Sequence, residues 1–485
     1  MSPDAVAQGN GTVPIRHRYS VLKSRYNSAM KTAELSGWGR YPIVTAEADE
    51  PDSLGRIASL TQHAYLPRGQ GRSYGDAGLP ATGHRAINSY RLTRLISFNP
   101  FSGVIDAEAG VTLQAILRVA VPRGFFLPVT PGTMAVSLGG ALASNVHGKN
   151  HHHSGSIEHF VLEMEVATPS GTFVCSPTVL PDLFCATLGG YGLTGFITRA
   201  MLRLKPIATA KVETLRVRAP GLDSLFALLS KHDTDFEYSV AWLDTLARGK
   251  SLGRGVLMLG NHASAQGAQP GLPSPGPSAS AESASLSAPR EKRPFKVPFS
   301  MPGILLNRPF LSAFNALFYR FSPGGRSRED FEGFFYPLDG IGDWNRLYGR
   351  SGFFQYQCVI PDPRGEDGIA AALAFLSGNG LGAFLSVLKR CGDDEVMLPF
   401  CKRGYTLALD IPFRGPGTLR ALDRLDELVI GFGGRVYLTK DARLRPDAFR
   451  AMYPESRAWM DVVRRYNPEA RSNSRLAERL ELWKA

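Results

Sequence analysis

Two glycine-rich stretches carry the residue types best suited to holding a large anionic ligand. The first, residues 67–76, reads PRGQGRSYGD, and the second, residues 131–156, contains five glycines and four histidines. Glycine lets the backbone approach a flat or phosphorylated molecule closely, with amide groups directed toward it. The second stretch offers too few apolar side chains for a core helix or strand. Two such loops about sixty residues apart predict one large anionic cofactor held from two sides.

The glycine spacing argues against two common phosphate-binding motifs. After Gly69 and Gly71 the next glycine is Gly75, which does not fit the G-x-G-x-x-G pattern of a nicotinamide site. No long amphipathic helix is expected to open there, and the motif GxxxxGK[ST] is absent from the sequence. We therefore expect neither a nicotinamide Rossmann site nor a P-loop.

The histidines of the second stretch raise the alternative of a metal site. His147 and His151 have the H-x-x-x-H spacing that can place two imidazoles on one side of a helix. Gly148 disfavours a regular helix and no acidic third ligand is near, so we expect no metal. A polar surface loop without chemistry is the other alternative. We favour a cofactor loop in which a buried His147 is a hydrogen-bond donor.

Length, charge and cysteine use restrict the class of protein. A chain of 485 residues exceeds what one hydrophobic core usually serves, so we expect two domains. The net charge of +12 favours an anionic partner, either a phosphorylated substrate, a membrane surface or nucleic acid, although no nucleic-acid recognition module is visible. Five scattered cysteines without a CxxC pair predict reduced thiols rather than a disulfide framework or a metal spacing. Without an apolar leader or a run of eighteen apolar residues, we expect no signal peptide, no transmembrane helix, and a cytoplasmic or peripheral membrane location.

Apolar periodicity predicts the elements that must position the two loops. Polar residues alternate along residues 353–360, FFQYQCVI, so Gln355 and Gln357 should face one cavity from a single strand. Helices are expected at 51–61, 112–121, 180–188 and 417–429, and strands at 63–66, 86–88, 95–98, 104–107, 160–167 and 171–175.

Three segments fall outside this regular pattern. Residues 1–35 are expected to form a flexible N-terminal arm. Residues 263–290 are rich in Ser, Ala, Pro and Gly and predict a disordered loop inserted into the chain. Residues 292–321 are basic, aromatic and apolar together, which fits either an ordinary packed segment or a contact with a membrane surface or lipid tail.

Several motifs resemble one flavoprotein superfamily. RGQGRSYGD, PGTMAVSLGGALASNVHGKNHH, LFCATLGGYGLTGFITRA and YLTKDARL are similar to the vanillyl-alcohol-oxidase (PCMH-type) superfamily, and within it to the decaprenylphosphoryl-β-D-ribose oxidase family. The resemblance covers nearly the whole chain except the arm and the 263–290 loop. It implies an α+β fold, with a PCMH-type FAD-binding domain from residues 36–210 and 433–485. Residues 211–432 would form a substrate domain with an antiparallel sheet.

The resemblance also implies how FAD would be held. The first loop would cradle the pyrophosphate, and the second would line the flavin and its ribityl chain. Many relatives attach FAD covalently to a histidine where this chain has Arg72, so we expect non-covalent FAD. The implied cofactor residues are Pro67, Arg68, Gly69, Gln70, Gly71, Arg72, Ser73, Tyr74, Gly75, Asp76, Ala77, Gly132, Ser137, Leu138, Gly139, Gly140, Ser144, Asn145, Val146, His147, Ile197 and Tyr437.

The reaction implied is oxidation of the 2′ hydroxyl of a polyprenyl-phosphoryl ribose to a ketone, with FAD as the hydride acceptor. This is the first half of an epimerisation to arabinose, which a partner short-chain reductase would complete. Lys440 matches the family's active-site lysine and would hold the substrate or the reduced-flavin anion, while His147 would hydrogen-bond it and position the alcohol. The implied substrate contacts are Tyr74, Gln355, Gln357, Trp242 and, for the phosphate, Lys389.

Two departures from the family leave the exact substrate open. Phe335 replaces a tyrosine of the actinobacterial enzymes, and Ala408 replaces a cysteine in the strand that faces the flavin. One alternative function is an aldonolactone oxidase of the same superfamily, which would act on a free sugar lactone. Another is a non-catalytic sugar or lipid carrier that has kept the fold.

Overall fold

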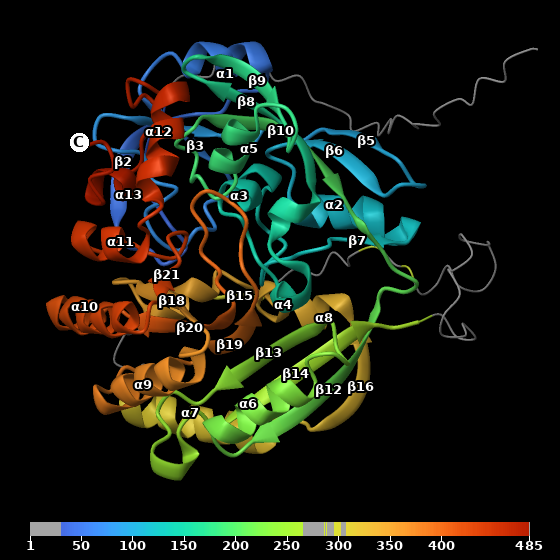
Figure 1. Cartoon of the computed structure of the whole chain (residues 1–485), viewed down its shortest axis with the longest axis vertical. Coiled ribbons are helices and arrows are strands. Elements are labelled where there is room, and N and C mark those ends of the chain that lie inside the picture. Colours follow the sequence, from blue (N-terminus) through green and yellow to red (C-terminus); the bar gives the residue numbers. More distant parts are fainter. Residues whose placement is uncertain (1–30, 265–285, 287, 289–294, 302–306, 485) are drawn as a thin grey trace, which may run out of the picture.

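The chain folds into two halves that meet along a central interface (Figure 1). The computed structural model describes residues 31–484 apart from 265–285, 287, 289–294 and 302–306. Most of the expected N-terminal arm and of the expected 263–290 loop therefore lies outside the described residues. Among the described helices, none has both the length and the apolar character needed to cross a membrane.

A mixed four-stranded sheet lies at the start of the chain, with the strand order β1-β2-β4-β3. It comprises β1 (Lys31–Ser36), β2 (Ile43–Asp49), β3 (Tyr65–Arg68) and β4 (Arg85–Asn88). The expectation of a flexible arm is wrong for residues 31–35, because β1 pairs with β2 along its whole length. Helix α1 (Leu54–Leu60) connects β2 to β3, close to its predicted place.

An antiparallel five-stranded sheet follows, with the order β5-β6-β10-β8-β9. Its strands are β5 (Leu95–Phe98), β6 (Val104–Glu108), β8 (Val161–Thr168), β9 (Gly171–Cys175) and β10 (Phe196–Arg203). Helix α2 (Leu113–Ala120) begins after Thr112, whose hydroxyl accepts a hydrogen bond from the amide of Ala115. The helix predicted over 180–188 appears as α5 (Pro181–Thr187).

The glycine-rich second stretch contains two short helices, α3 (Leu138–Ala143) and α4 (His151–Ser154). The prediction that this stretch cannot form a core helix is wrong for α3. Ser137 caps α3 by accepting a hydrogen bond from the amide of Gly140, and α3 packs against β6 and β10. Small residues serve here because they let the helix backbone approach the sheet closely.

An antiparallel eight-stranded sheet forms the other half, in the order β16-β12-β14-β13-β19-β20-β18-β21. Its strands are β12 (Lys211–Ala219), β13 (Tyr238–Leu243), β14 (Gly255–His262), β16 (Gly325–Asp330), β18 (Phe353–Pro361), β19 (Ser386–Cys391), β20 (Gly404–Pro412) and β21 (Arg435–Val436). Helices α6 (Leu222–Lys231) and α9 (Gly365–Gly378) pack on the face turned away from the first half (Figure 1). The opposite face of the sheet is turned toward the first half and can border a ligand-binding site.

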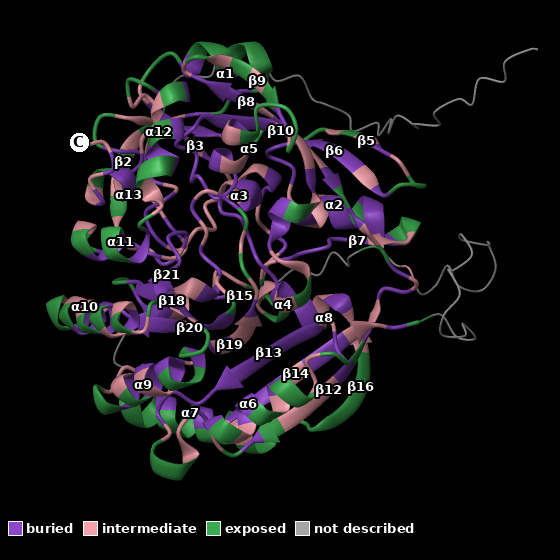
Figure 2. Ribbon diagram, viewed as in Figure 1, coloured by how far each residue is buried: buried purple, intermediate pink, exposed green. Residues whose placement is uncertain are grey.

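Shorter helices complete this half. Helix α7 (Arg308–Phe321) precedes β16, and α8 (Phe331–Phe335) follows it. Helix α10 (Pro416–Gly431) packs against α9 and leads into β21. The buried residues run through both halves and across the interface between them (Figure 2).

The C-terminal segment returns to the first half as α11 (Pro446–Met452), α12 (Ser456–Tyr466) and α13 (Arg475–Arg479). The amide of Tyr65 donates to the carbonyl of Arg471 at 2.7 Å. The guanidinium of Arg479 pairs with the buried carboxylates of Asp76 and Asp441, each at 2.8 Å. These contacts hold the C-terminal segment against β3 and the first glycine loop.

Candidate functional site

A large cavity of about 1740 Å³ lies between the eight-stranded sheet and the two glycine-rich loops. That volume exceeds the roughly 300–1,000 Å³ of a pocket for one small ligand. Most of the sequence-predicted site residues border it. They are Pro67, Arg68, Gly69, Gln70, Gly71, Arg72, Ser73, Tyr74, Ala77, Gly132, Ser137, Gly139, Gly140, Ser144, Val146, His147, Ile197, Trp242, Gln355, Gln357, Lys389, Tyr437 and Lys440.

Four predicted cofactor residues lie behind this wall instead of on it. Gly75, Asp76, Leu138 and Asn145 are not among the lining residues. Asp76 is turned toward Arg479, and a Cβ on Gly75 would overlap the backbone of Asp441. Leu138 is fully buried in the core, and Asn145 accepts a hydrogen bond from the amide of Glu158. We infer that these residues shape the two loops without contacting the ligand.

The first loop leaves a row of backbone amides available to a ligand. Arg68, at the end of β3, donates from its guanidinium to the carbonyls of Gly78 at 2.8 Å and Ser36 at 3.0 Å, so its side chain braces the loop from behind. Gly71 has φ +63°, and a Cβ there would lie 2.5 Å from that guanidinium. Within the described part of the chain, the amides of residues 69–72 have no protein acceptor. Four adjacent free donors suit an anion.

The two loops contact each other at glycines. A Cβ on Gly69 would overlap the hydroxyl of Ser137, the residue that caps α3. A Cβ on Gly139 would lie 2.8 Å from that of Ala109. A side chain at Gly69 would push the two loops apart, so this glycine sets the width of the cradle, whereas Gly139 lets α3 approach the segment that follows β6.

Lys440 borders the cavity and is partly buried. Its ammonium lies 3.8 Å from the ring centroid of Tyr74. Burial lowers the pKa of Lys440 to about 7, with the charge of Asp410 opposing that shift and Lys389 adding to it. Near neutral pH this amine can therefore both donate and accept a proton.

Asp410 is a site residue that the sequence reasoning missed. It is fully buried on β20, where it stands opposite Gln355 in the strand pairing, and its Oδ1 accepts from the side-chain amide of Gln355 at 2.6 Å. The hydroxyl of Tyr348 lies 3.3 Å from its other oxygen. Burial raises the pKa of Asp410 to about 7, against the effects of Gln355, Lys440 and Tyr348. The carboxyl group thus orients Gln355 and interacts electrostatically with Lys440.

His147 is held between two side chains of the sheet. Its Nε2 lies 3.0 Å from the side-chain amide of Gln357, and its Nδ1 lies 3.1 Å from Nζ of Lys389. Burial and the positive charge of Lys389 lower the pKa of His147 well below its usual range, so the ring is neutral. The expected hydrogen bond from His147 to Lys440 does not form, because Lys389 takes that place. Lys389 also donates to the carbonyl of Gly148 at 3.3 Å.

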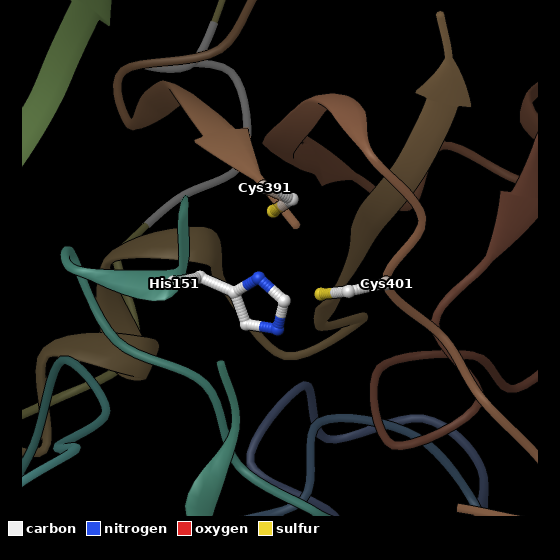
Figure 3. A group of neighbouring side chains, drawn as sticks. All are labelled: His151, Cys391 and Cys401. Atoms are coloured by element: carbon white, nitrogen blue, oxygen red, sulfur yellow. The ribbon is translucent and has the colours of Figure 1, made fainter. Parts of the chain in front are cut away.

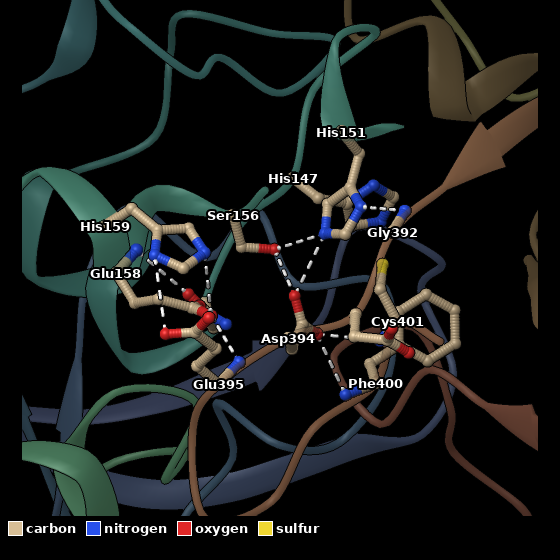
Figure 4. Close-up of polar contacts among 12 residues, drawn as sticks. His147, His151, Ser156, Glu158, His159, Gly392, Asp394, Glu395, Phe400 and Cys401 are labelled. Carbon is tan, nitrogen blue, oxygen red and sulfur yellow. Dashed lines mark hydrogen bonds and ion pairs between the residues drawn. The ribbon is translucent and has the colours of Figure 1, made fainter. Parts of the chain in front are cut away.

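A hydrogen-bonded cluster supports the loop that carries His147 (Figure 4). The carboxylate of Asp394 accepts from the hydroxyl of Ser156 at 2.6 Å and lies 3.0 Å from Nε2 of His151. Its second oxygen accepts from the amides of Phe400 and Cys401 at 3.1 and 2.7 Å. One buried carboxylate therefore joins the second glycine-rich stretch to the loop after β19.

His151 also lies beside two cysteine thiols (Figure 3). The ligand atoms of His151, Cys391 and Cys401 lie within 4.8 Å of one another, although the sequence spacing gave no sign of such a group. The amide of Gly392 donates to Nδ1 of His151 at 3.0 Å, and Nε2 faces Asp394. Because both ring nitrogens already have hydrogen-bond partners, we interpret this group as a structural support for the neighbouring loop.

The two departures from the resembled family both lie on the cavity wall. Phe335 packs against Phe126 and Tyr238, with ring centroids 5.1 and 4.8 Å apart. Ala408 faces the cavity from β20, between Gln357 of β18 and Val387 of β19. Both positions can therefore influence which substrate fits.

Comparison with known proteins identifies the kind of site. Residues 43–176 match the family described as FAD binding domain. The decaprenylphosphoryl-β-D-ribose oxidase of Mycolicibacterium smegmatis is 33% identical over 93% of this chain and 98% of its own length. An uncharacterised protein of Streptomyces coelicolor is 35% identical over 77% of the chain and 100% of its own length. A putative D-arabinono-1,4-lactone oxidase of Neurospora crassa is 26% identical over 34% of the chain and 30% of its own length.

These similarities confirm FAD as the cofactor and the PCMH-type α+β fold, and the residues present fit that cofactor. Its pyrophosphate is an anion that needs hydrogen-bond donors, and the free amides of residues 69–72 can provide them. Among the described residues, buried polar atoms without a protein partner also border or adjoin the cavity, and these are the Nε atoms of Arg68 and Arg72 and Oγ of Ser89.

Proposed function

This chain belongs to the family of FAD-dependent oxidoreductases that includes the decaprenylphosphoryl-β-D-ribose oxidase of Mycolicibacterium smegmatis, and we propose that it oxidises the 2′ hydroxyl of a polyprenyl-phosphoryl ribose. The product would be the 2′ keto sugar, and the step would be the first half of an epimerisation to arabinose. Residues 36–210 with 433–485 would bind FAD, and residues 211–432 would bind the substrate.

One arrangement carries this proposal, namely Lys440, His147 and two glutamines directed into the cavity that the glycine-rich loops border. FAD, when bound, supplies the hydride acceptor. The amine of Lys440, with a pKa of about 7, is suited to accept the hydroxyl proton as the carbon–hydrogen bond breaks. Gln355, fixed by Asp410, and Gln357, fixed by His147, would orient the sugar hydroxyls.

The cofactor is expected to be held without a covalent bond. Arg72 has no nucleophilic atom for such a link, and its guanidinium stacks 4.3 Å over the ring of Trp38. Acid precipitation of the purified holoenzyme should therefore release the yellow colour into the supernatant. A yellow pellet would contradict this assignment.

The proposed substrate predicts two partners. The keto product has to be reduced at the same carbon to complete the inversion, so a short-chain reductase is the expected protein partner. The lipid part of the substrate predicts a peripheral membrane location. Helix α7, in the described part of segment 292–321, exposes Phe310, Leu317 and Phe321, with Phe321 71% exposed. Exposed aromatic and aliphatic side chains of this kind favour a membrane interface.

The decisive experiment offers the holoenzyme a polyprenyl-phosphoryl ribose and, separately, a free aldonolactone. We expect loss of the flavin absorbance and formation of a keto sugar only with the first compound. Oxidation of the lactone alone would favour the aldonolactone oxidase alternative, whose relative aligns with only 34% of the chain. A non-catalytic carrier does not fit a chain of this oxidoreductase family.

A further inference from the structure

The outer part of the cavity is larger and less polar than a ribose requires. The inner part holds Lys440, His147, Gln355 and Gln357, whereas the outer part is bordered by the far strands of the eight-stranded sheet, by α7 and by α8. Its lining residues are Arg216, Val240, Trp242, Met258, Phe310, Phe314, Phe318 and Phe334. This apolar outer part differs from the polar part that would bind the sugar, so we expect it to bind a different part of the ligand.

Strand pairing makes this wall continuous with the sugar site. Gln357 stands opposite Ala408, Ala408 opposite Val387, and Val387 opposite Trp242. Residues directly opposite each other in an antiparallel sheet place their side chains on the same face. The row therefore runs from the glutamine near the proposed sugar site across the sheet to Trp242.

A parallel row reaches an arginine on the far side. Val240 stands opposite Met258, and Met258 stands opposite Arg216 of β12. The guanidinium of Arg216 donates from Nη2 to Glu329 at 2.8 Å, while its buried Nε has no partner among the described residues. The Arg216 side chain as a whole is 28% exposed and borders the cavity, so its guanidinium can meet a ligand there.

Lys149 adds a second cation to this part of the cavity. Its ammonium donates to the carbonyl of Phe334 and lies 4.2 Å from the centroid of that ring. Burial lowers the pKa of Lys149 to about 7, and the positive charges of Lys389 and Arg216 contribute to the shift. Mutual repulsion of these cations would be relieved by an anion between them. Glu332 also borders the cavity, and its carboxylate disfavours a ligand with a high negative charge.

Aromatic side chains continue from this cationic group to the surface. Trp242 packs against Phe318 of α7 with ring centroids 4.5 Å apart, and Phe314 stacks against Phe318 at 6.2 Å. Phe310, Phe314 and Phe318 follow at intervals of four residues, so they share one face of the helix. Phe310 and Phe318 are 50% and 41% exposed. The apolar wall therefore opens beside an exposed aromatic helix face.

We propose that Lys149 and Arg216 bind the phosphodiester of the lipid-linked sugar, and that its prenyl chain leaves along Trp242, Met258 and the aromatic face of α7. This assignment rests on the proposed substrate class and replaces Lys389 as the phosphate contact. Lys389 is engaged with His147 and Gly148, whereas Arg216 retains an unpartnered donor. A phosphate flanked by cations and followed by an apolar wall matches an amphiphile with one charged group.

Calorimetric titration of the holoenzyme with farnesyl phosphate, farnesol and inorganic phosphate tests this assignment without any sugar oxidation. We expect farnesyl phosphate to bind at least tenfold more tightly than either fragment. Arg216→Met should weaken farnesyl phosphate at least tenfold and leave farnesol within twofold. Trp242→Ala should weaken both prenyl compounds.

Arg218→Met is the matched control, because Arg218 lies on the same strand but does not border the cavity. It should leave all three affinities within twofold. Arg216→Lys keeps the positive charge and should bind farnesyl phosphate more tightly than Arg216→Met, with bound FAD and the melting temperature as checks of folding. If Arg216→Met does not fold, Lys149→Met replaces it, with the same tenfold loss expected.

Equal effects of Arg216→Met and Arg218→Met, or equal binding of farnesol and farnesyl phosphate, would overturn the assignment. These outcomes differ from failure of the proposed function. Charge-dependent farnesyl phosphate binding without oxidation of polyprenyl-phosphoryl ribose would remove the proposed reaction and keep the lipid phosphate site. Oxidation of polyprenyl-phosphoryl ribose that is insensitive to Arg216→Met would keep the proposed reaction and remove the lipid phosphate site.

Discussion

Lys440 and Lys389 are two partly buried lysines of one cavity, yet their surroundings differ. Lys440 follows β21 and interacts with the carboxyl group of Asp410 and the ring of Tyr74. Lys389 lies on β19 and is bonded to the neutral ring of His147 and to a backbone carbonyl. Burial lowers the pKa of Lys389, and the thiols of Cys391 and Cys401 oppose that shift.

This difference indicates that the two lysines have different roles, one in proton transfer and one in positioning. A lysine with a carboxylate nearby and a pKa near neutrality can exchange a proton during a reaction. A lysine that donates to a histidine ring and a carbonyl instead fixes the position of that ring. Removing the first should damage the chemical step, and removing the second should mainly disturb positioning.

Lys440→Met should have the largest effect. We expect kcat to fall by roughly 10²–10⁴-fold, because the methionine cannot accept the hydroxyl proton. Single-turnover reduction of the bound FAD by substrate measures this step directly. The matched variant Lys389→Met should retain most of that rate, and equal losses in the two variants would remove the distinction between the lysines.

Asp410→Asn tests whether Asp410 controls the protonation of Lys440. The negative charge raises the pKa of Lys440 against burial, so its removal should lower that pKa further below 7. If the neutral amine is the active form, kcat/KM rises with pH through the pKa of Lys440, and this rising limb should move to lower pH. We expect a loss of about tenfold in kcat/KM at the plateau, because Gln355 also loses a charged partner.

The pH profile of the variant decides between two roles of the amine. An unchanged rising limb would show that Asp410 does not act through Lys440. A falling limb at the same pH would instead assign the active form to the ammonium ion. Asp410→Glu, which retains the charge, provides the control and should keep its limb close to that of the native enzyme.

The sequence alone predicted the parts of this site that depend on local pattern. Alternation in residues 353–360 placed Gln355 and Gln357 on one face, and glycine content identified both loops. Lys440 and Lys389 came from family resemblance, since a lone lysine has no distinguishing pattern. Asp410 was missed because its position opposite Gln355 arises from the pairing of strands far apart in the sequence.

Two predictions from the sequence, a flexible arm over residues 31–35 and no core helix in the second glycine-rich stretch, were wrong for a related reason. Residues 31–35 lack a strong local pattern, but pairing with β2 makes them a strand. Helix α3 is short and contains two glycines, and it forms because Ser137 caps it and its small residues pack against β6 and β10. In both cases contacts with distant parts of the chain outweigh local composition.

Lys389→Met should have an intermediate effect. Without the ammonium group, Nδ1 of His147 loses its donor, and among the described residues Gln357 is then the remaining side-chain hydrogen-bond partner of the ring. We expect kcat/KM to fall by about tenfold, mostly through KM, as for a lost charge-assisted hydrogen bond. Lys389→Gln retains a donor group and should recover part of the loss. If Lys389→Gln recovers no activity and kcat falls as far as in Lys440→Met, Lys389 takes part in the chemical step.

Asp394→Asn should have the smallest effect on turnover, although it alters a buried group. Asp394 lies outside the cavity and joins Ser156, His151 and the loop after β19 by hydrogen bonds. An asparagine has a single acceptor oxygen in place of two, so at least one of the bonded donors loses its partner. We expect a loss of about 1–3 kcal/mol in the free energy of unfolding, measured by denaturant titration of the holoenzyme. A large fall in kcat with unchanged stability would instead make this cluster part of the active site, and the positioning role assigned to the His147 side of the cavity would have to extend to it.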